Sequence, residues 1–192
     1  MKTICVYCGS SSQADAVFFE AAREFGKILA ENQITLVYGG GNMGLMGEIA
    51  DSVLQSGGKV IGIIPQFMLD EGWFHSGLTE LIVVETMHER KKKMIEISDA
   101  LVALPGGCGT FEELFEALTW KQLGLITHPL VIANIADYYQ PIISQLNSGV
   151  SEKFIREEHL KIFSVAHSHT EILPALQNST LWCKTYRKFA QI

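Results

Sequence analysis

The sequence predicts a single α/β domain in which helices cover both faces of a doubly wound, mainly parallel sheet. Short apolar runs alternate with segments of helical periodicity, glycines and other small residues follow several of these runs, and no linker or repeat divides the chain. Strands and helices that alternate in this way form βαβ units with parallel strands. Because 192 residues, 47% of them hydrophobic, suffice for one core, we expect one domain over residues 1–192.

Each element of this domain has its own pattern. Ala14–Glu31 carries an apolar stripe at helical spacing, and a second helix is expected to open at the loop Pro105–Thr110. Ligands of such open sheets bind beyond the carboxyl ends of the strands, so the segments that follow the strands are the expected site. Six apolar runs have the length of buried strands: Thr3–Tyr7, Ile34–Tyr38, Val60–Ile64, Leu81–Glu85, Ala100–Leu104 and Leu130–Ala133.

Composition and charge exclude several classes of partner. The formal net charge is -6, with 15 Lys+Arg against 21 Asp+Glu, which argues against a nucleic-acid-binding protein. No apolar run approaches the roughly 20 residues of a membrane span, and the N-terminal segment lacks the pattern of a signal peptide. A cytoplasmic protein is therefore expected, and the sparse cysteines agree with a reducing compartment. The four cysteines are Cys5, Cys8, Cys108 and Cys183.

The glycine-rich segment Pro105–Thr110 follows a predicted strand and opens a predicted helix. Glycines allow the backbone to approach a ligand closely, and the free amides of a helix N-terminus bind anions such as phosphate. The same segment also has a structural interpretation, since Thr110-x-x-Glu113 has the pattern of a capping box with Thr110 as the N-cap. The three glycines exceed what a cap requires and favour a ligand, but the role of Glu113 stays open between cap and site residue.

Arg90 lies in a run of charged residues that is mostly typical of a solvated helix face. Helical spacing nevertheless aligns Arg90 with Met87, Met94 and Ile97, so we expect its guanidinium group on the packed side of the helix. An inward arginine requires an anion, and its fork suits a phosphate or a carboxylate. A ligand and a structural carboxylate partner both remain open for Arg90.

Residues 39–44 match the G-x-G-x-x-G pattern of dinucleotide-binding loops. That fingerprint also requires an acidic residue at the end of the next strand, and here Pro65 ends that strand instead. A phosphate or nucleotide cradle that includes Gly40, Gly41 and Gly44 therefore fits better than an NAD site. No glycine loop is followed by Gly-Lys-Ser/Thr, which argues against a Walker-type triphosphate site.

Three other patterns give no site. Cys5-x-x-Cys8 lies within and just after a strand rather than at a helix start, which argues against a redox pair. Cys108 has no evident histidine base, so a nucleophilic role is not expected. His167 and His169 lack further spaced ligands, so no metal site is expected.

Several motifs together resemble the cytokinin-activating phosphoribohydrolases called LONELY GUY, whose relatives often carry the label "possible lysine decarboxylase". The matching segments span roughly residues 3–135, and the spacing between Arg90 and the Gly-Gly-x-Gly-Thr loop also agrees. They are Cys8-Gly9-Ser10-Ser11, Gly39-Gly40-Gly41-x-Met43-Gly44-Leu45-Met46-Gly47, Met87-His88-Glu89-Arg90-Lys91 and Pro105-Gly106-Gly107-x-Gly109-Thr110-x-x-Glu113.

This resemblance implies a Rossmann-like homodimer without a metal or redox cofactor. It implies hydrolysis of a nucleoside 5′-monophosphate, AMP or an N6-substituted AMP, to the free base and ribose 5-phosphate. Arg90 and Glu113 would be the catalytic pair, and Lys91 would contact the nucleotide together with Gly107, Cys108, Gly109 and Thr110. The family also has a binding glutamate after the third strand. Glu71 is the expected counterpart, with Glu80 as the alternative, because residues 70–75 depart from the family pattern.

Glycosidic cleavage develops positive charge on the ribose, which a carboxylate such as Glu113 can stabilise, or the carboxylate can activate water. Two rival functions remain. A non-catalytic nucleotide or molybdenum-cofactor carrier would share the fold, but would not need the pair of Arg90 and Glu113. An amino-acid decarboxylase would need a lysine for pyridoxal phosphate, and none lies in a fitting loop at the predicted ligand edge.

Overall fold

A computed structural model of the chain describes residues 1–179 and Trp182. Cys183 lies outside the described residues. Within the described part, seven strands form one sheet in the order β4-β3-β2-β1-β5-β6-β7, and every adjacent pair is parallel. The predicted doubly wound, parallel sheet is therefore confirmed. The strands are β1 (Thr3–Tyr7), β2 (Thr35–Tyr38), β3 (Val60–Pro65), β4 (Glu80–Val84), β5 (Ala100–Ala103), β6 (Leu130–Ala133) and β7 (Ser164–Ala166).

The six predicted strands agree with β1 to β6 to within one residue at each end. The seventh strand was not predicted from the sequence. It has only three residues and pairs along one side with β6, so its apolar pattern is too short to distinguish it from a loop.

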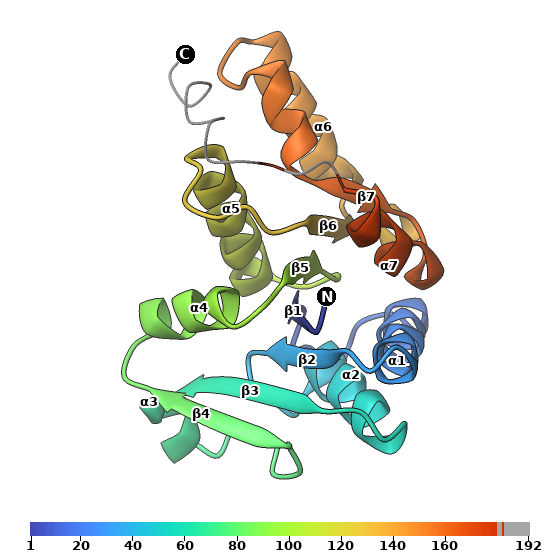
Figure 1. Cartoon of the computed structure of the whole chain (residues 1–192), viewed down its shortest axis with the longest axis vertical. Coiled ribbons are helices and arrows are strands. Elements are labelled where there is room, and N and C mark those ends of the chain that lie inside the picture. The colour runs from blue at the N-terminus through green and yellow to red at the C-terminus, as the bar shows by residue number, and fades with distance from the viewer. Residues whose placement is uncertain (180–181, 183–192) are drawn as a thin grey trace.

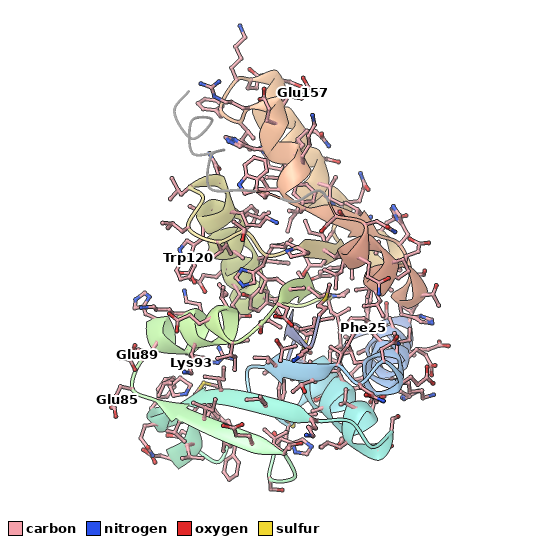
Figure 2. All side chains as sticks on the ribbon, viewed as in Figure 1. Phe25, Glu85, Glu89, Lys93, Trp120 and Glu157 are labelled. Carbon is pink, nitrogen blue, oxygen red and sulfur yellow. The ribbon has the colours of Figure 1, made fainter. Side chains whose placement is uncertain are left out.

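Helices cover both faces of the sheet, as Figure 1 shows. The helices α1, α2 and α7 pack against one face, while α4, α5 and α6 pack against the other. Figure 2 shows Phe25 of α1 and Trp120 of α5 on opposite sides of the sheet. The α-helices are α1 (Ala16–Glu31), α2 (Gly44–Gln55), α3 (Gln66–Asp70), α4 (Met87–Glu96), α5 (Cys108–Gln122), α6 (Gln140–Ser151) and α7 (His169–Gln177), and two 3-10 helices are η1 (Ile135–Asp137) and η2 (Glu157–Ile162).

The core has one layer on each side of the sheet. Successive side chains of β1 alternate between the layers, since Ile4 and Val6 pack toward α1 and α2, whereas Cys5 and Tyr7 pack toward α4 and α5. Both faces of the central strands are therefore buried, which explains why these strands read as continuous apolar runs rather than as alternating patterns.

The strand order reverses between β1 and β5. Crossovers from β1 lead outward through β2, β3 and β4, and the chain then returns to β5 on the other side of β1. At such a switch point the loops after the two neighbouring strands diverge and leave a crevice beyond their carboxyl ends. In this chain those loops are the one after Tyr7 and the one that begins with Leu104 and Pro105.

Candidate active site

A pocket of about 550 Å³ lies at the carboxyl ends of the central strands, where the switch point predicts it. Its lining comes from the loops after β1, β2 and β5, from α2, from α3 and the turn after it, and from the N-terminal parts of α4 and α5. The lining residues are Cys8, Gly9, Ser10, Gly41, Asn42, Met43, Met46, Met68, Trp73, Met87, Arg90, Gly107, Cys108, Gly109, Thr110, Glu112 and Glu113.

Arg90 is buried at this pocket and is held by three groups. Its Nε donates to the Ile63 carbonyl (3.0 Å), its Nη2 to the Gly39 carbonyl (3.2 Å), and its Nη1 to Glu113 Oε1 (3.3 Å). The prediction that Arg90 lies on the packed face of its helix is confirmed. Because two carbonyls and one carboxylate fix the guanidinium plane, the side chain has a defined orientation before any ligand binds.

Glu113 is the carboxylate partner of Arg90, and both side chains are about nine-tenths buried. Burial raises the pKa of Glu113 to about 7, an effect that Arg90 opposes. Glu112 and Glu116 add to the rise, and Lys91 opposes it. A carboxyl group with a pKa near neutrality can hold or release a proton at physiological pH, which suits acid–base chemistry.

Of the two interpretations left open for Thr110 and Glu113, the capping box is wrong. Helix α5 begins three residues earlier than the pattern requires, with Gly107 at the N-cap, and no side chain caps it. Thr110 is consequently the third residue of the helix, and Glu113 lies a full turn farther along, on the buried face. The cap therefore does not account for Glu113.

A side-chain cap is present at α4 instead. Thr86 is the N-cap there, and its hydroxyl accepts a hydrogen bond from the Glu89 amide (3.1 Å). A side chain thus accepts a hydrogen bond from one of the free amides at the N-terminus of α4. The N-terminus of α5 instead lines the pocket with Gly107, Cys108 and Gly109. An uncapped helix N-terminus at a pocket suits an anion, because its free amides and the helix dipole both favour negative charge.

Lys91 is buried but does not line the pocket. It donates to Glu112 and to Glu116, which lie on successive turns of α5. These contacts join α4 to α5, so Lys91 fixes the relative position of the two helices that carry Arg90 and Glu113. Among the described residues of the lining there is no lysine.

The glycine loop after β2 mainly leaves room for neighbouring groups, and only part of it lines the pocket. Gly41 lines the pocket, whereas Gly40 and Gly44 do not. Gly39, which was not among the expected site residues, leaves room for Arg90, since a Cβ atom there would lie 1.8 Å from Arg90 Nη2. Gly44 has a φ of 58°, and its Cβ would lie 2.4 Å from the Ser10 carbonyl carbon. The loop after β2 therefore packs closely against the loop after β1, which contains Ser10.

The segment after β3 brings different residues to the pocket from the one expected. Glu71 is exposed at the end of α3, and Glu80 is exposed at the start of β4, and neither lines the pocket. Met68 and Trp73 of the same segment do line it. We expected a glutamate from this segment and did not predict these two apolar residues. An exposed tryptophan in a loop is itself an indication of a binding surface.

The structure also describes the cysteine pair and the surroundings in which a metal site was considered, and of the two cysteines Cys8 lines the pocket. Cys5 and Cys8 are buried free thiols, and burial raises the pKa of both above the ordinary value. Over residues 1–179 and Trp182, no three histidine, cysteine, aspartate or glutamate side chains gather as a metal site would require. Within the same residues, no helix has the length and apolar character of a membrane span.

The sequence is similar to known proteins along most of its length. The family model described as "Possible lysine decarboxylase" matches residues 46–176. A cytokinin riboside 5′-monophosphate phosphoribohydrolase of Oryza sativa subsp. japonica is 42% identical over 176 residues, which cover 92% of this chain and 73% of that protein. The protein of that name from Rhodococcoides fascians is 44% identical over 155 residues, which cover 80% of this chain and 78% of the other.

Solved structures of the same fold come from more distant proteins. The molybdenum cofactor carrier protein of Chlamydomonas reinhardtii superposes with a TM-score of 0.70 at 22% identity and covers 92% of this chain and 96% of its own. The molybdenum cofactor binding protein of Rippkaea orientalis gives a TM-score of 0.70 at 20% identity, with the same coverage. At these identities the likeness shows the fold alone. The family model and the relatives above 40% identity show more, and this chain belongs to the LONELY GUY family of cytokinin riboside 5′-monophosphate phosphoribohydrolases.

Proposed function

We propose that this chain is a phosphoribohydrolase that cleaves the N-glycosidic bond of a purine nucleoside 5′-monophosphate. The substrate would be AMP or an N6-substituted AMP, such as a cytokinin riboside 5′-monophosphate, and the products would be the free base and ribose 5-phosphate. One observation carries the proposal. A buried carboxyl group, Glu113, lies in a pocket beside the uncapped N-terminus of α5 and is paired with a fixed arginine.

In this proposal the 5′-phosphate binds at the start of α5. Gly107, Cys108, Gly109 and Thr110 form the first turn of the helix and line the pocket. A Cβ atom at Gly107 or Gly109 would meet no other atom within 4 Å, so the space in front of these residues is open. Their amides would donate to the phosphate oxygens.

Glu113 and Arg90 would then act at the ribose. As the glycosidic bond breaks, positive charge develops on the sugar, and the Glu113 carboxylate stabilises that charge or takes a proton from the attacking water. The hydroxyl of the water adds to the anomeric carbon, and the bond electrons leave with the base, which gains a proton. Arg90 holds the carboxylate in place and fixes the geometry of the pair. Lys91 and Glu71 lie outside the lining, so the support for them as nucleotide contacts comes from the family motif alone.

The decisive experiment is incubation of the protein with a panel of nucleotides, followed by chromatography for free bases. AMP and its N6-substituted derivatives should release base, whereas the matching nucleosides should react far more slowly, because the binding energy of the remote phosphate is lost. Equal rates for AMP and adenosine would contradict the proposal. Binding of a nucleotide without release of base would favour the carrier function.

We also propose that the protein is a cytoplasmic homodimer. The relatives support the family, and the acidic composition and sparse cysteines agree with a cytoplasmic location. Phe115 of α5, together with Leu123 and Leu125 of the turn that follows it, supplies an exposed apolar surface on which a second copy can pack.

A further inference from the structure

The pocket is lined by two kinds of residue. The polar part of the lining includes Arg90, Glu113 and the first turn of α5. The large apolar side chains of the lining are Met43, Met46, Met68, Trp73 and Met87. Four of the six methionines of the chain are thus gathered at one pocket, and their flexible thioethers suit an apolar surface of varied shape.

Trp73 is placed by the way α3 ends. Gly72 has a φ of 75°, its amide donates to the Leu69 carbonyl (3.0 Å), and the Trp73 amide donates to the Met68 carbonyl (3.0 Å). This pair of bonds is the Schellman motif, which brings the residue after the glycine against the helix residue five positions earlier. Trp73 and Met68 hold those two positions, and both line the pocket.

His75 fixes the chain on the other side of Trp73. Its amide donates to the Gly40 carbonyl (2.9 Å), and its ring Nδ1 accepts from the Gly77 amide (3.0 Å). The acceptor role of Nδ1 leaves the proton on Nε2, which donates to Asp51 Oδ1 of α2 (2.9 Å). Trp73 is therefore held between a helix cap and a tether to the glycine loop, so its backbone is in place before a ligand binds.

The side chain of Trp73 is not needed for the helix cap that positions its backbone. Its side chain is 54% exposed, whereas the cap that positions it uses only backbone groups. Phe67 of α3 is about equally exposed, at 52%, but does not line the pocket. The two residues differ in placement rather than in exposure, which makes Phe67 a matched control for Trp73.

Building on the proposed function, we infer that Trp73 is a specificity-determining residue whose indole ring covers the base of the nucleotide. With the phosphate at α5 and the ribose at Glu113, the base would contact apolar side chains of the lining, among them Trp73. Flat aromatic bases pack favourably on an indole, and a base with more apolar area gains more from that contact. Trp73 should therefore account for much of the difference in kcat/KM between a nucleotide whose base carries an apolar N6 substituent and AMP.

The test compares kcat/KM for N6-benzyladenosine 5′-monophosphate with kcat/KM for AMP in each variant. Their ratio removes any effect that the two substrates share at the catalytic step. Trp73→Ala should lower the ratio about 10-fold or more, the scale on which apolar pockets discriminate. Trp73→Phe should restore most of the preference, and Phe67→Ala should leave the ratio at the wild-type value.

The outcomes separate this inference from the proposed function. If the wild type releases base from AMP but Trp73→Ala keeps the wild-type ratio, the inference is overturned and the function stands. An unchanged ratio together with an altered mass in light scattering would identify Trp73 as an interface contact and would also overturn it.

If the wild type cleaves no nucleotide, the proposed function fails, and binding still tests the inference. Titration with N6-benzyladenosine 5′-monophosphate should then quench tryptophan fluorescence in the wild type and not in Trp73→Phe. Equal quenching in both proteins, or quenching in neither, would overturn the inference.

Discussion

At the scale of single residues, the pKa of Glu113 depends on burial between α5 and the sheet. The residue is on a helix beside Glu112 and near Glu116, and neither neighbour is buried as deeply. Depth, rather than the local run of acidic residues, is the largest cause of the raised pKa, and Arg90 limits the rise. The surroundings of Glu113 therefore distinguish it from the other acidic residues of α5.

Replacing Glu113 with glutamine should reduce turnover of AMP by about 100-fold or more, the usual scale for losing acid–base or electrostatic help. The amide still offers an oxygen to Arg90, so the fold should survive, with a melting temperature lowered by the loss of the charge pair. Steady-state hydrolysis and thermal melts measure the two effects. Glu152→Gln, at an exposed position after α6 and outside the pocket lining, is the control and should keep its turnover.

Near-wild-type turnover in a well-folded Glu113→Gln protein would contradict the catalytic role. Because no side-chain cap exists at the start of α5, loss of a cap cannot account for a fall in turnover.

The activity should also depend on pH through Glu113. A carboxyl group with a pKa of about 7 is mostly protonated below that pH and mostly ionised above it. If the carboxylate is the reactive form, kcat/KM for AMP should rise as the pH increases through about 7. The phosphate of the substrate titrates near pH 6 in every variant, so the inflection that disappears in Glu113→Gln belongs to Glu113. A fall in kcat/KM over the same range would instead assign the protonated acid as the active form.

At the scale of the elements, the two helix N-termini near the site have different tasks. Thr86 caps α4 and thereby holds the helix that carries Arg90, whereas the start of α5 is built of small residues and faces the pocket. The glycines around the site divide in the same way. Gly44 is required by its positive φ and by its contact with Ser10, while Gly109 faces open space in the pocket.

Alanine substitutions should separate these two kinds of glycine. Gly44→Ala should lower the free energy of unfolding by more than about 1 kcal/mol, because a Cβ is strained at this φ and collides with the neighbouring loop. Gly109→Ala should not lower the free energy of unfolding, since its Cβ meets no atom and Gly109 is helical, but should raise KM for AMP about 10-fold by occupying pocket volume at the phosphate. Denaturant unfolding and steady-state kinetics measure the two. An unaltered KM in Gly109→Ala would place the phosphate elsewhere.

At the scale of the whole molecule, the topology explains why one fold serves proteins as different as the carriers and this family. The switch point between β1 and β5 provides a crevice whatever residues follow the strands. In this chain the side chains at that crevice include the ion pair of Arg90 and Glu113. Function must therefore be argued from the site rather than from the fold.

Association of two copies should involve the exposed apolar side chains of α5 and the turn that follows it. Phe115 is 41% exposed there, and Leu123 and Leu125 continue the surface. Phe115→Glu should convert a dimer into a monomer at micromolar concentration, because a charge would be buried without a partner. Phe154→Glu, at an exposed position after α6, should leave the dimer intact. Light scattering reports the mass. A stable wild-type monomer would contradict the prediction, whereas larger assemblies built from dimers would not.

The sequence by itself determined the elements and the edge of the sheet at which the site lies. Apolar runs and helical stripes predicted six of the seven strands, and the glycine-rich segments after them predicted the loops that line the pocket. The inward position of Arg90 was also predictable from helical spacing. These features are local, since each depends on the periodicity of a short segment.

Only the tertiary structure decided how distant residues meet. The pairing of Arg90 with Glu113, the room that Gly39 leaves for the guanidinium group, and the burial that raises the pKa of Glu113 all involve different elements. The capping-box interpretation of Thr110 was wrong because the start of α5 depends on the path of the chain leaving β5 and not on the local pattern alone. Trp73 enters the pocket because a helix cap and the His75 tether direct the chain there. Contacts between segments far apart in the sequence have no local periodicity, so they become visible only when the sheet brings the loops together.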